Sequence, residues 1–379
     1  MTARVVIAFD SFKGSIAASV AVHAFAAGWR AARPGDELIP RPMADGGEGT
    51  LEAFAAAVPS ARRVPVVVRG PHGADVAASW LMLPAAAGDV GVTAVVELAS
   101  TSGFELLDQP SPWDADTSGF GQAIADALDS GARRLILGIG SSASTDGGAG
   151  VLTALGARLT DATGAPIAPG LRGLGQLADV DLSGIRRLPE GGVTVLCDVT
   201  SPLTGPRGAA AVFGPQKGLD ADGIRFADDR LTRFAELLGG LAHAETPGAG
   251  AAGGTGYALL AWGARLVPGA AEIARRSGLA EAVSAPDTVL VVTGEGSYDA
   301  QSRAGKVPAF VADAADAAGV PVALVAGRIA DDADLAPFRA VVALTDVAGS
   351  AAAAVADPER WLKAAGSQLA RLTDGLVDG

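Results

Sequence analysis

Residues 5–32, VVIAFDSFKGSIAASVAVHAFAAGWRAA, contain the pattern that decides the fold class. Residues 5–10 are a nearly continuous apolar run that ends at an aspartate, which is typical of a parallel strand buried on both faces. A loop with a glycine follows, and Ser15 can cap a helix in which Ile16 and Val20 lie four residues apart. A strand, a loop and a helix in this order begin a βα unit.

Apolar runs and alanine-rich helical stretches alternate along the rest of the chain. Most of the runs are continuous rather than alternating, which indicates strands that are covered on both faces. The sequence therefore predicts an α/β fold with mostly parallel sheets. The predicted strands are residues 5–10, 38–42, 93–98, 134–138, 193–198, 288–293, 321–326 and 340–345.

The composition is that of a globular protein with room for two domains. The chain has 379 residues, of which 49% are hydrophobic and 19% are charged. No apolar run approaches the roughly 18 residues that a membrane span needs, and the N-terminus begins like a strand rather than a signal peptide. The single cysteine, Cys197, cannot form an internal disulfide, which favours a reducing compartment. We therefore expect a cytoplasmic protein without a membrane partner.

The formal net charge of −13 argues against a nucleic-acid partner, because an acidic chain repels phosphate backbones. The same charge repels any small anionic substrate. An anion can therefore bind only where local lysine, arginine, backbone amides or Mg²⁺ overcome that field.

Two turn-rich positions suggest a division into domains. Residues 70–73, GPHG, form a turn cluster, and residues 285–286, AP, precede a βα series that continues to the C-terminus. We therefore predict that residues 1–68 and 286–379 form one discontinuous domain, and that residues 69–285 form a second α/β domain inserted into it.

Glycine-rich loops with charged or hydroxyl side chains follow most of the predicted strands. In parallel sheets, ligands bind outside the carboxyl ends of the strands. Glycine allows the backbone to approach a phosphate closely, and helix N-termini direct N–H donors at anions. One such loop is weak evidence, but five at one sheet edge favour a binding site. The loops are residues 10–15, 43–50, 139–148, 198–202 and 294–299, and Arg328 follows a further strand.

Several common sites are absent from the sequence. Residues 138–143 fit G-x-G-x-x-A, but no helix pattern continues from them and Asp161 lies in a turn, which argues against a dinucleotide site. Lys306 is followed by Val307 instead of Ser or Thr, so no Walker motif is present. The three histidines lack zinc-ligand spacing, and a general base is therefore expected to be Asp or Glu.

Seven segments in one order, from about residue 5 to residue 330, resemble the motifs of the bacterial class I glycerate kinases. The segments are DSFKGS (10–15), MADGGEGT (43–50), TDGGAG (145–150), CDVT (197–200), VFGPQKG (212–218), GAGAAGGTG (248–256) and GEG (294–296). Three positions depart from the family pattern: Thr145 and Ser201 replace Asn, and Ser297 replaces Arg. The replacement of Arg by Ser297 leaves a related hydroxy acid open as the substrate.

The resemblance implies an ATP-dependent kinase with Mg²⁺, whose small-molecule partners are D-glycerate and ATP. It implies two α/β domains, one flavodoxin-like or Rossmann-like with a parallel sheet and the other inserted into it, with the active site in the cleft between them. It favours 2-phosphoglycerate over 3-phosphoglycerate as the product. A kinase of another hydroxy acid, a sensor without catalysis and a homodimeric state stay open. Charged residues at so many strand ends argue against the sensor.

Phosphoryl transfer depends on positioning and charge stabilisation, and four residues are expected to supply them. Lys13 is expected to hold the substrate carboxylate or the transferred phosphoryl group, and Asp198, at the end of an apolar strand, is the preferred base. Glu295 and Asp299, four residues apart in one glycine loop, are expected to hold Mg²⁺. Their structural alternatives are a solvated lysine, a hydrogen-bonding aspartate and a loop-stabilising pair.

Two further sets complete the predicted site. The residues predicted to bind the substrate are Ser11, Asp45, Glu48, Lys217 and Arg328. The residues predicted to bind nucleotide or phosphate are Ser141, Ser142, Asp146, Gly147, Gly253 and Gly254. The structural alternative for Asp45 and Glu48 is that they cap the next helix. The alternative for Lys217 is that it is an ordinary lysine in a turn.

Overall fold

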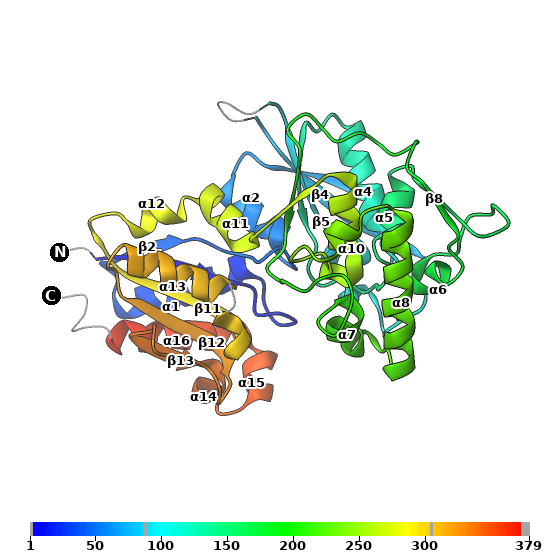
Figure 1. Cartoon of the computed structure of the whole chain (residues 1–379). Helices are drawn as coiled ribbons and strands as arrows, with labels where there is room; N and C mark the ends of the chain where they lie inside the picture. Colours follow the sequence, from blue (N-terminus) through cyan, green and yellow to red (C-terminus); the bar gives the residue numbers. More distant parts are fainter. Residues whose placement is uncertain (1–2, 86–89, 304–305, 373–379) are drawn as a thin grey trace. The chain divides into compact units, whose positions relative to one another are not determined.

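The computed structural model describes residues 3–85, 90–303 and 306–372, and its fold is α/β (Figure 1). A five-stranded sheet has the order β13-β12-β11-β1-β2, and a six-stranded sheet has the order β10-β9-β6-β5-β4-β3. The predicted α/β class with mostly parallel sheets is therefore confirmed. The chain divides into two compact units: unit 1 is Met1–Asp45, Glu52–Pro59 and Ala270–Gly379, and unit 2 is Gly46–Leu51 and Ser60–Gly269.

Unit 1 contains the five-stranded sheet, in which every neighbouring pair of strands is parallel. Its strands are β1 (Arg4–Phe9), β2 (Glu37–Pro40), β11 (Thr288–Tyr298), β12 (Val322–Ile329) and β13 (Ala340–Ala343). Its helices are α1 (Ala18–Ala32), α11 (Gly269–Ser277), α12 (Leu279–Val283), η3 (Ala300–Arg303), α13 (Val307–Ala317), α14 (Leu344–Ala348), α15 (Ala351–Ala356) and α16 (Pro358–Leu372). The bounds of α11 begin one residue before the unit does, and α2 (Thr50–Ala57) includes residues of both units.

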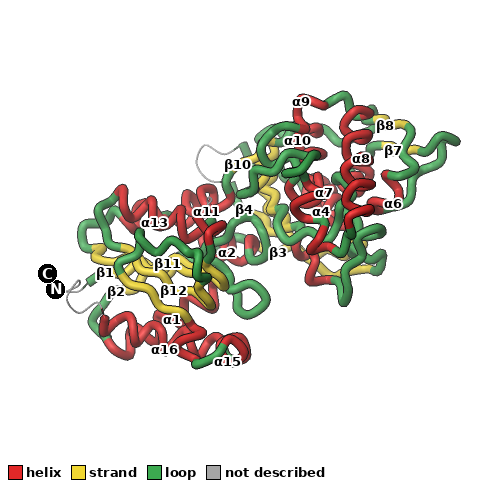
Figure 2. Tube along the Cα trace, turned by 60° about the horizontal axis from the view of Figure 1, so that its bottom comes forward, coloured by secondary structure: helices red, strands yellow, loops and turns green. Residues whose placement is uncertain are grey.

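Helices cover both faces of this sheet, with α1 and α16 on one face and α13 on the other (Figure 2). Val5, Ile7 and Phe9 of β1 are fully buried, as predicted for a strand between two helical layers. The first helix starts at Ala18, later than predicted, because residues 12–16 form a tight turn in which Phe12 and Ile16 exchange backbone hydrogen bonds.

Unit 2 contains the six-stranded sheet and a small two-stranded one. Its strands are β3 (Arg62–Arg69), β4 (Asp75–Leu83), β5 (Thr93–Glu97), β6 (Arg134–Gly138), β7 (Arg158–Thr160), β8 (Asp179–Asp181), β9 (Val193–Leu196) and β10 (Arg265–Val267). Its helices are α3 (Ala99–Ser102), η1 (Phe104–Leu106), α4 (Ser118–Asp129), α5 (Ala149–Ala154), α6 (Gly170–Leu174), α7 (Ala209–Phe213), η2 (Pro215–Lys217), α8 (Ala221–Leu237), α9 (Leu241–Ala244) and α10 (Ala251–Trp262). In the large sheet β3, β4 and β5 pair antiparallel, and the other neighbours are parallel.

All eight predicted strands overlap a strand of the structure. The sequence did not predict the antiparallel pair β3 and β4, and β11 runs five residues past its predicted end, to Tyr298. The predicted domains, residues 1–68 with 286–379 and residues 69–285, remain a prediction. The units begin and end elsewhere, since β3 belongs to the six-stranded sheet and α12 to unit 1.

No helix within residues 3–85, 90–303 and 306–372 combines the length and the apolar character needed to cross a membrane.

Gly28→Ala should destabilise unit 1, because α1 and α16 approach each other too closely for a side chain there. A Cβ atom at Gly28 would lie 1.8 Å from the backbone oxygen of Lys363, so the helices would have to move apart. Overpacking of this kind typically costs about 1–3 kcal/mol in the free energy of unfolding. Urea denaturation followed by circular dichroism measures the effect. Gly35→Ala is the matched control, since Gly35 has open space around it and should unfold near the parent midpoint.

Candidate active site

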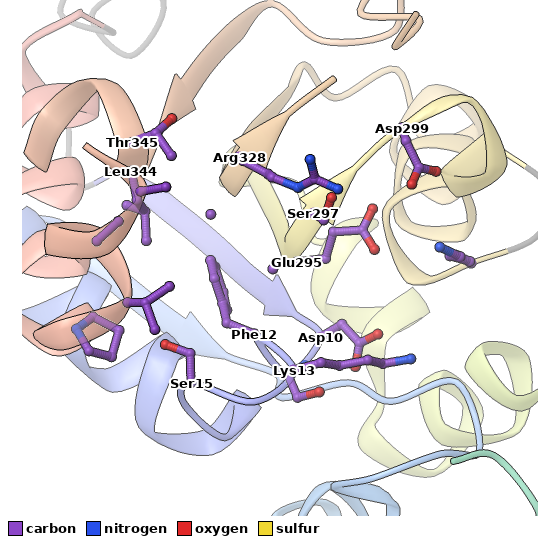
Figure 3. A pocket seen from close by; sticks show the side chains of 18 residues that line it. Asp10, Phe12, Lys13, Ser15, Glu295, Ser297, Asp299, Arg328, Leu344 and Thr345 are labelled. Atoms are coloured by element: carbon purple, nitrogen blue, oxygen red, sulfur yellow. The ribbon is translucent and has the colours of Figure 1, made fainter. Parts of the chain in front are cut away.

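The site in unit 1 lies where the strand order of the five-stranded sheet reverses. From β1 the chain continues to β2 on one side, and β11, β12 and β13 follow on the other side of β1. Open parallel sheets bind ligands at such a switch point, outside the carboxyl ends of the strands. A cavity of about 450 Å³ lies here, bounded by the loop after β1, the end of β11 and parts of β12, α14 and α15 (Figure 3).

Three ionisable side chains of the β1 and β2 loops form the charged edge of this site. The ammonium group of Lys13 lies 3.3 Å from Oδ2 of Asp45, and the Lys13 side chain is 54% exposed. Asp10 is buried and accepts a hydrogen bond of 2.7 Å from the backbone N–H of Ser11. Burial raises the pKa of Asp10 well above its ordinary value. The negative charge of Asp45 adds to this shift, and the positive charge of Lys13 opposes it. The negative charge of Asp45 in turn raises the pKa of Lys13. The sequence did not place Asp10 in the site, although this residue directly follows β1.

Glu295 contributes a second buried carboxylate from β11 and is only 6% exposed. Burial raises the pKa of Glu295, while a hydrogen bond from Ser302 and the charge of Lys306 oppose the shift. Within the described residues, Oε1 of Glu295 and the hydroxyls of Ser11 and Ser297 are buried without a hydrogen-bond partner. All three residues line the cavity. Because buried polar atoms almost always have partners, this concentration indicates a polar ligand.

Two predictions about the β11 and β12 segments are wrong in their local structure. Glu295 does not lie in a flexible glycine loop with Asp299, because β11 continues to Tyr298 and pairs with β12. Arg328 does not follow β12 but lies within it, opposite Ser297. The backbone N–H of Asp299 donates to the Ser302 hydroxyl at 3.1 Å, which fixes the turn after the strand. The structure still brings Glu295, Asp299 and Arg328 to one cavity, with Ser11 and Lys13.

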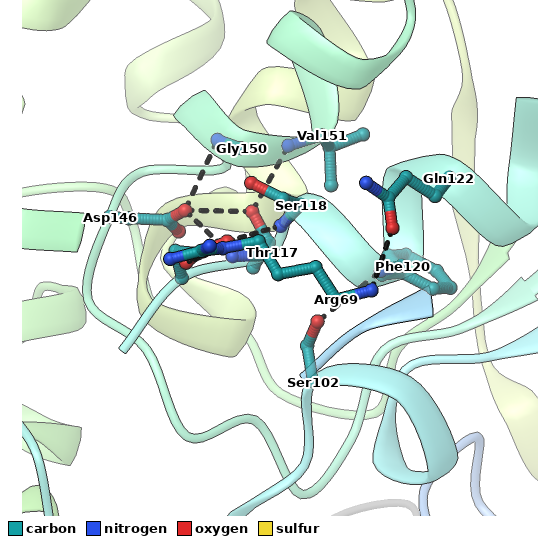
Figure 4. A network of polar contacts seen from close by, with 10 residues as sticks. Arg69, Ser102, Thr117, Ser118, Phe120, Gln122, Asp146, Gly150 and Val151 are labelled. Carbon is teal, nitrogen blue, oxygen red and sulfur yellow. Dashed lines mark hydrogen bonds and ion pairs between the residues drawn. The ribbon is translucent and has the colours of Figure 1, made fainter. Parts of the chain in front are cut away.

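In unit 2, Asp146 is fully buried at the start of α5 (Figure 4). Its Oδ2 atom accepts hydrogen bonds from the N–H and hydroxyl of Thr117, at 3.0 and 2.8 Å, and from the N–H of Gly150 at 3.2 Å. Its Oδ1 atom accepts from the hydroxyl of Ser144 at 3.1 Å and the N–H of Gly148 at 3.0 Å. Five protein donors therefore hold the carboxylate. This geometry supports a role in positioning the turn rather than the predicted contact with phosphate.

Lys217 is also buried, which overturns its interpretation as an ordinary turn lysine. It lies in η2, is 3% exposed, and its ammonium group donates a hydrogen bond to the backbone carbonyl of Ser144. Burial lowers the pKa of Lys217 to about 8, and the charge of Asp146 opposes the shift. Lys217 thus supports the same turn that Asp146 fixes.

The predicted glycines pack backbone against backbone around this turn. Gly147 donates its N–H to the carbonyl of Gly253 at 3.0 Å. Gly253 has φ +65°, and a Cβ atom there would lie 2.1 Å from the Ser144 oxygen. A Cβ atom at Gly254 would lie 2.9 Å from Cα of Gly147. Close packing therefore requires glycine at these positions, whether or not a ligand binds nearby.

The serines beside these glycines are also engaged in local structure. Ser141 adopts φ +59°, and its carbonyl accepts a hydrogen bond of 2.8 Å from the N–H of Phe104. The hydroxyl of Ser142 lies 3.3 Å from that of Ser144 and accepts a hydrogen bond from the Ser144 N–H. Both serines thus lie in the turn that contains Asp146 and that Lys217 supports from η2.

Two predicted residues of unit 2 lie in other loops. Asp198 follows β9, is half-buried, and its Oδ1 atom accepts a hydrogen bond of 2.9 Å from the N–H of Gly269, the first residue of α11. This contact matches its structural alternative. Glu48 is exposed in the loop before α2.

Lys217→Met should change how stability depends on pH. The folded pKa of about 8 lies below the ordinary value of 10.5, so between these values the unfolded chain binds more protons than the folded one. The stability of the parent should therefore rise with pH across this window, relative to the variant, which has no titrating group at 217. Urea midpoints of both proteins between about pH 7 and pH 10 measure the difference. A difference that is constant over this range would contradict a lowered pKa.

Comparisons with known proteins agree with the family resemblance of the seven sequence segments. The sequence model of the glycerate kinase family matches residues 5–374. The chain is 42% identical to a glycerate kinase of Bacillus subtilis (strain 168), over 91% of this chain and 90% of that protein. It is 44% identical to a glycerate 2-kinase of Escherichia coli (strain K12), over 87% and 86% of the two chains. A crystal structure of a candidate glycerate kinase 2 from Salmonella typhimurium LT2 superimposes with a TM-score of 0.80 and 38% identity, covering 99% of each chain. The chain belongs to the glycerate kinase family.

Proposed function

We propose that this enzyme transfers the γ-phosphoryl group of ATP to the 2-hydroxyl of D-glycerate, giving 2-phosphoglycerate and ADP. The main structural support is that four charged side chains line one cavity at the switch point. They are Lys13, Arg328 and two buried carboxylates, Asp10 and Glu295. Phosphoryl transfer needs positioned cations for the charged oxygens and a base for the attacking hydroxyl. This set of side chains supplies both.

Lys13 and Arg328 are proposed to hold the anionic groups of the reactants. Lys13 keeps its positive charge because Asp45 and Asp10 raise its pKa. Arg328 projects from β12, whose backbone is fixed by pairing with β11, so its guanidinium group starts from a rigid strand (Figure 3). Guanidinium groups bind carboxylate and phosphate through paired N–H donors.

Two carboxylates are candidates for the base that accepts the hydroxyl proton. Asp198, proposed from the sequence, has one oxygen engaged by the N–H of Gly269. Asp10 is buried, has a raised pKa and lies in the charged cluster around Lys13. A base must lie within reach of the hydroxyl that it deprotonates, and Asp10 lines the cavity whereas Asp198 does not, which favours Asp10 over Asp198.

Glu295 and Asp299 are proposed to hold Mg²⁺. The buried Oε1 atom of Glu295 lacks a partner among the described residues and is the kind of hard oxygen ligand that Mg²⁺ prefers. No group of three or more His, Cys, Asp or Glu able to hold a metal occurs in the described ranges. That fits a cation held by one or two carboxylates together with nucleotide phosphates. When bound, Mg²⁺ would neutralise charge on the phosphate oxygens.

A homodimeric state stays open. A cytoplasmic location belongs to the proposal as well, on the sequence arguments alone. The same holds for a site formed by both predicted domains.

D-glycerate with ATP should release ADP in a coupled assay, and phosphorus NMR should identify 2-phosphoglycerate as the product. L-glycerate and other short hydroxy acids serve as comparison substrates, since Ser297 leaves more room than the Arg of the family pattern. Formation of 3-phosphoglycerate would correct the position of transfer. Tight binding of D-glycerate without any ADP release would instead favour a sensor.

Lys13→Ala should lower kcat/KM, because it removes a cation that contacts a reacting anion. The loss should correspond to about 2–4 kcal/mol of transition-state stabilisation. Stability should change little, since exposed ion pairs contribute about 0–1 kcal/mol. Lys363→Ala is a matched control: Lys363 is 50% exposed and pairs with Glu359 at 2.9 Å on α16. Equal kinetics of the two variants and the parent would remove Lys13 from the site.

A further inference from the structure

We propose that the cavity of unit 1 is the nucleotide site, with the adenine base against its apolar wall and the phosphates against Lys13 and Arg328. The inference rests on the proposed function for the identity of the nucleotide. It differs from the assignment made from the sequence, which placed the nucleotide phosphates at residues 141–147 and 253–254 of unit 2.

The cavity has two chemically different ends, one on each side of the Phe12 ring (Figure 3). One end is lined by charged and hydroxyl side chains: Asp10, Ser11, Lys13, Glu295, Ser297 and Arg328. Leu344 and Thr345 lie at the other end (Figure 3), and the lining residues that α15 and the start of α16 contribute to the cavity are apolar: Ala351, Ala354, Val355 and Pro358. A ligand with anionic groups for Lys13 and Arg328 at one end and a flat or apolar group at the other therefore suits the cavity, as a nucleotide does.

The size and place of the cavity agree with this ligand. Its volume of about 450 Å³ lies within the range of roughly 300–1,000 Å³ found for drug-sized ligands. D-glycerate is a three-carbon acid with a carboxylate and two hydroxyls, and it has no surface that gains from an apolar wall. The cavity also lies between the ends of β1 and β11, where flavodoxin-like sheets with the strand order 2-1-3-4-5 bind a phosphate-bearing cofactor.

Val355 supplies a second indication that a nucleotide base binds at the apolar wall. It is one of the more exposed large apolar side chains of the described residues, at 62%, and it lies on the cavity wall. Burial of such a side chain against a base removes apolar surface from water, which favours binding. The turn in unit 2 offers fewer free groups, because Asp146 is held by five protein donors and Gly253 is packed against Ser144.

The test compares ADP with inorganic tripolyphosphate, which has phosphates but no base. Both are titrated with Mg²⁺ into the full chain by isothermal calorimetry. Ala351→Trp should fill the apolar end and weaken ADP at least tenfold, while tripolyphosphate stays within about twofold of the parent. Lys13→Ala should weaken both ligands.

Ala352→Trp is the matched control, because Ala352 is the next residue of α15, is also exposed and does not line the cavity. It should bind both ligands like the parent. Val355→Asn is a second, smaller change, which should weaken ADP alone and keeps the test decisive if the tryptophan variant unfolds. Circular dichroism checks folding of each variant.

Unchanged ADP affinity in both cavity variants would overturn the proposal, as would an equal loss for ADP and tripolyphosphate. Absence of ADP binding by the parent would overturn it as well. The glycerate assay separates this outcome from the proposed function. Phosphorylation of glycerate with ADP binding insensitive to Ala351→Trp would reject the nucleotide site alone. Weakened ADP binding in a protein without glycerate phosphorylation would reject the activity alone.

Discussion

The parallel pairing of β1 with β11 is the contact on which the site in unit 1 depends. It runs from Arg4 opposite Thr288 to Phe9 opposite Gly294 and joins the N-terminal segment to the C-terminal part of unit 1. Because both strands run toward the same sheet edge, the residues after β1 and those of the last part of β11 face one cavity. The apolar character of β1 from Val5 to Phe9 permits this pairing, since helices cover both faces of the sheet. The loops could not meet without the burial of these two strands.

Burial at this edge also determines the chemistry of the side chains. Asp10 and Glu295 are removed from water, which disfavours their charged forms and raises the pKa of each. The cation of Lys13 partly offsets this effect. Unpartnered polar atoms such as Oε1 of Glu295 lower the stability of the free protein. A ligand that supplies their partners should therefore stabilise the folded state as it binds.

Unit 2 shows that a motif residue can serve the fold rather than the ligand. Asp146 is satisfied by five protein donors, and Gly253 has no room for a Cβ atom. Lys217 of η2 contacts the same turn and donates to the backbone carbonyl of Ser144. Together they fix a loop that would otherwise have many unpaired backbone groups. Residue identity in such a loop is determined by packing and hydrogen bonding as much as by catalysis.

The sequence by itself determined the α/β class, the eight predicted strands and the loops that carry charge, because continuous apolar runs and glycine-rich turns act locally. It did not determine which side chains are buried. Val20, part of the apolar four-residue spacing of the first helix, is 45% exposed, since an alanine-rich helix is apolar on nearly every side and only its contacts with β1 and α16 select a face. The burial of Lys217 and the inclusion of Asp10 in the site were likewise decided by the tertiary structure. Burial and pKa depend on neighbours from distant segments, and no local pattern specifies those neighbours.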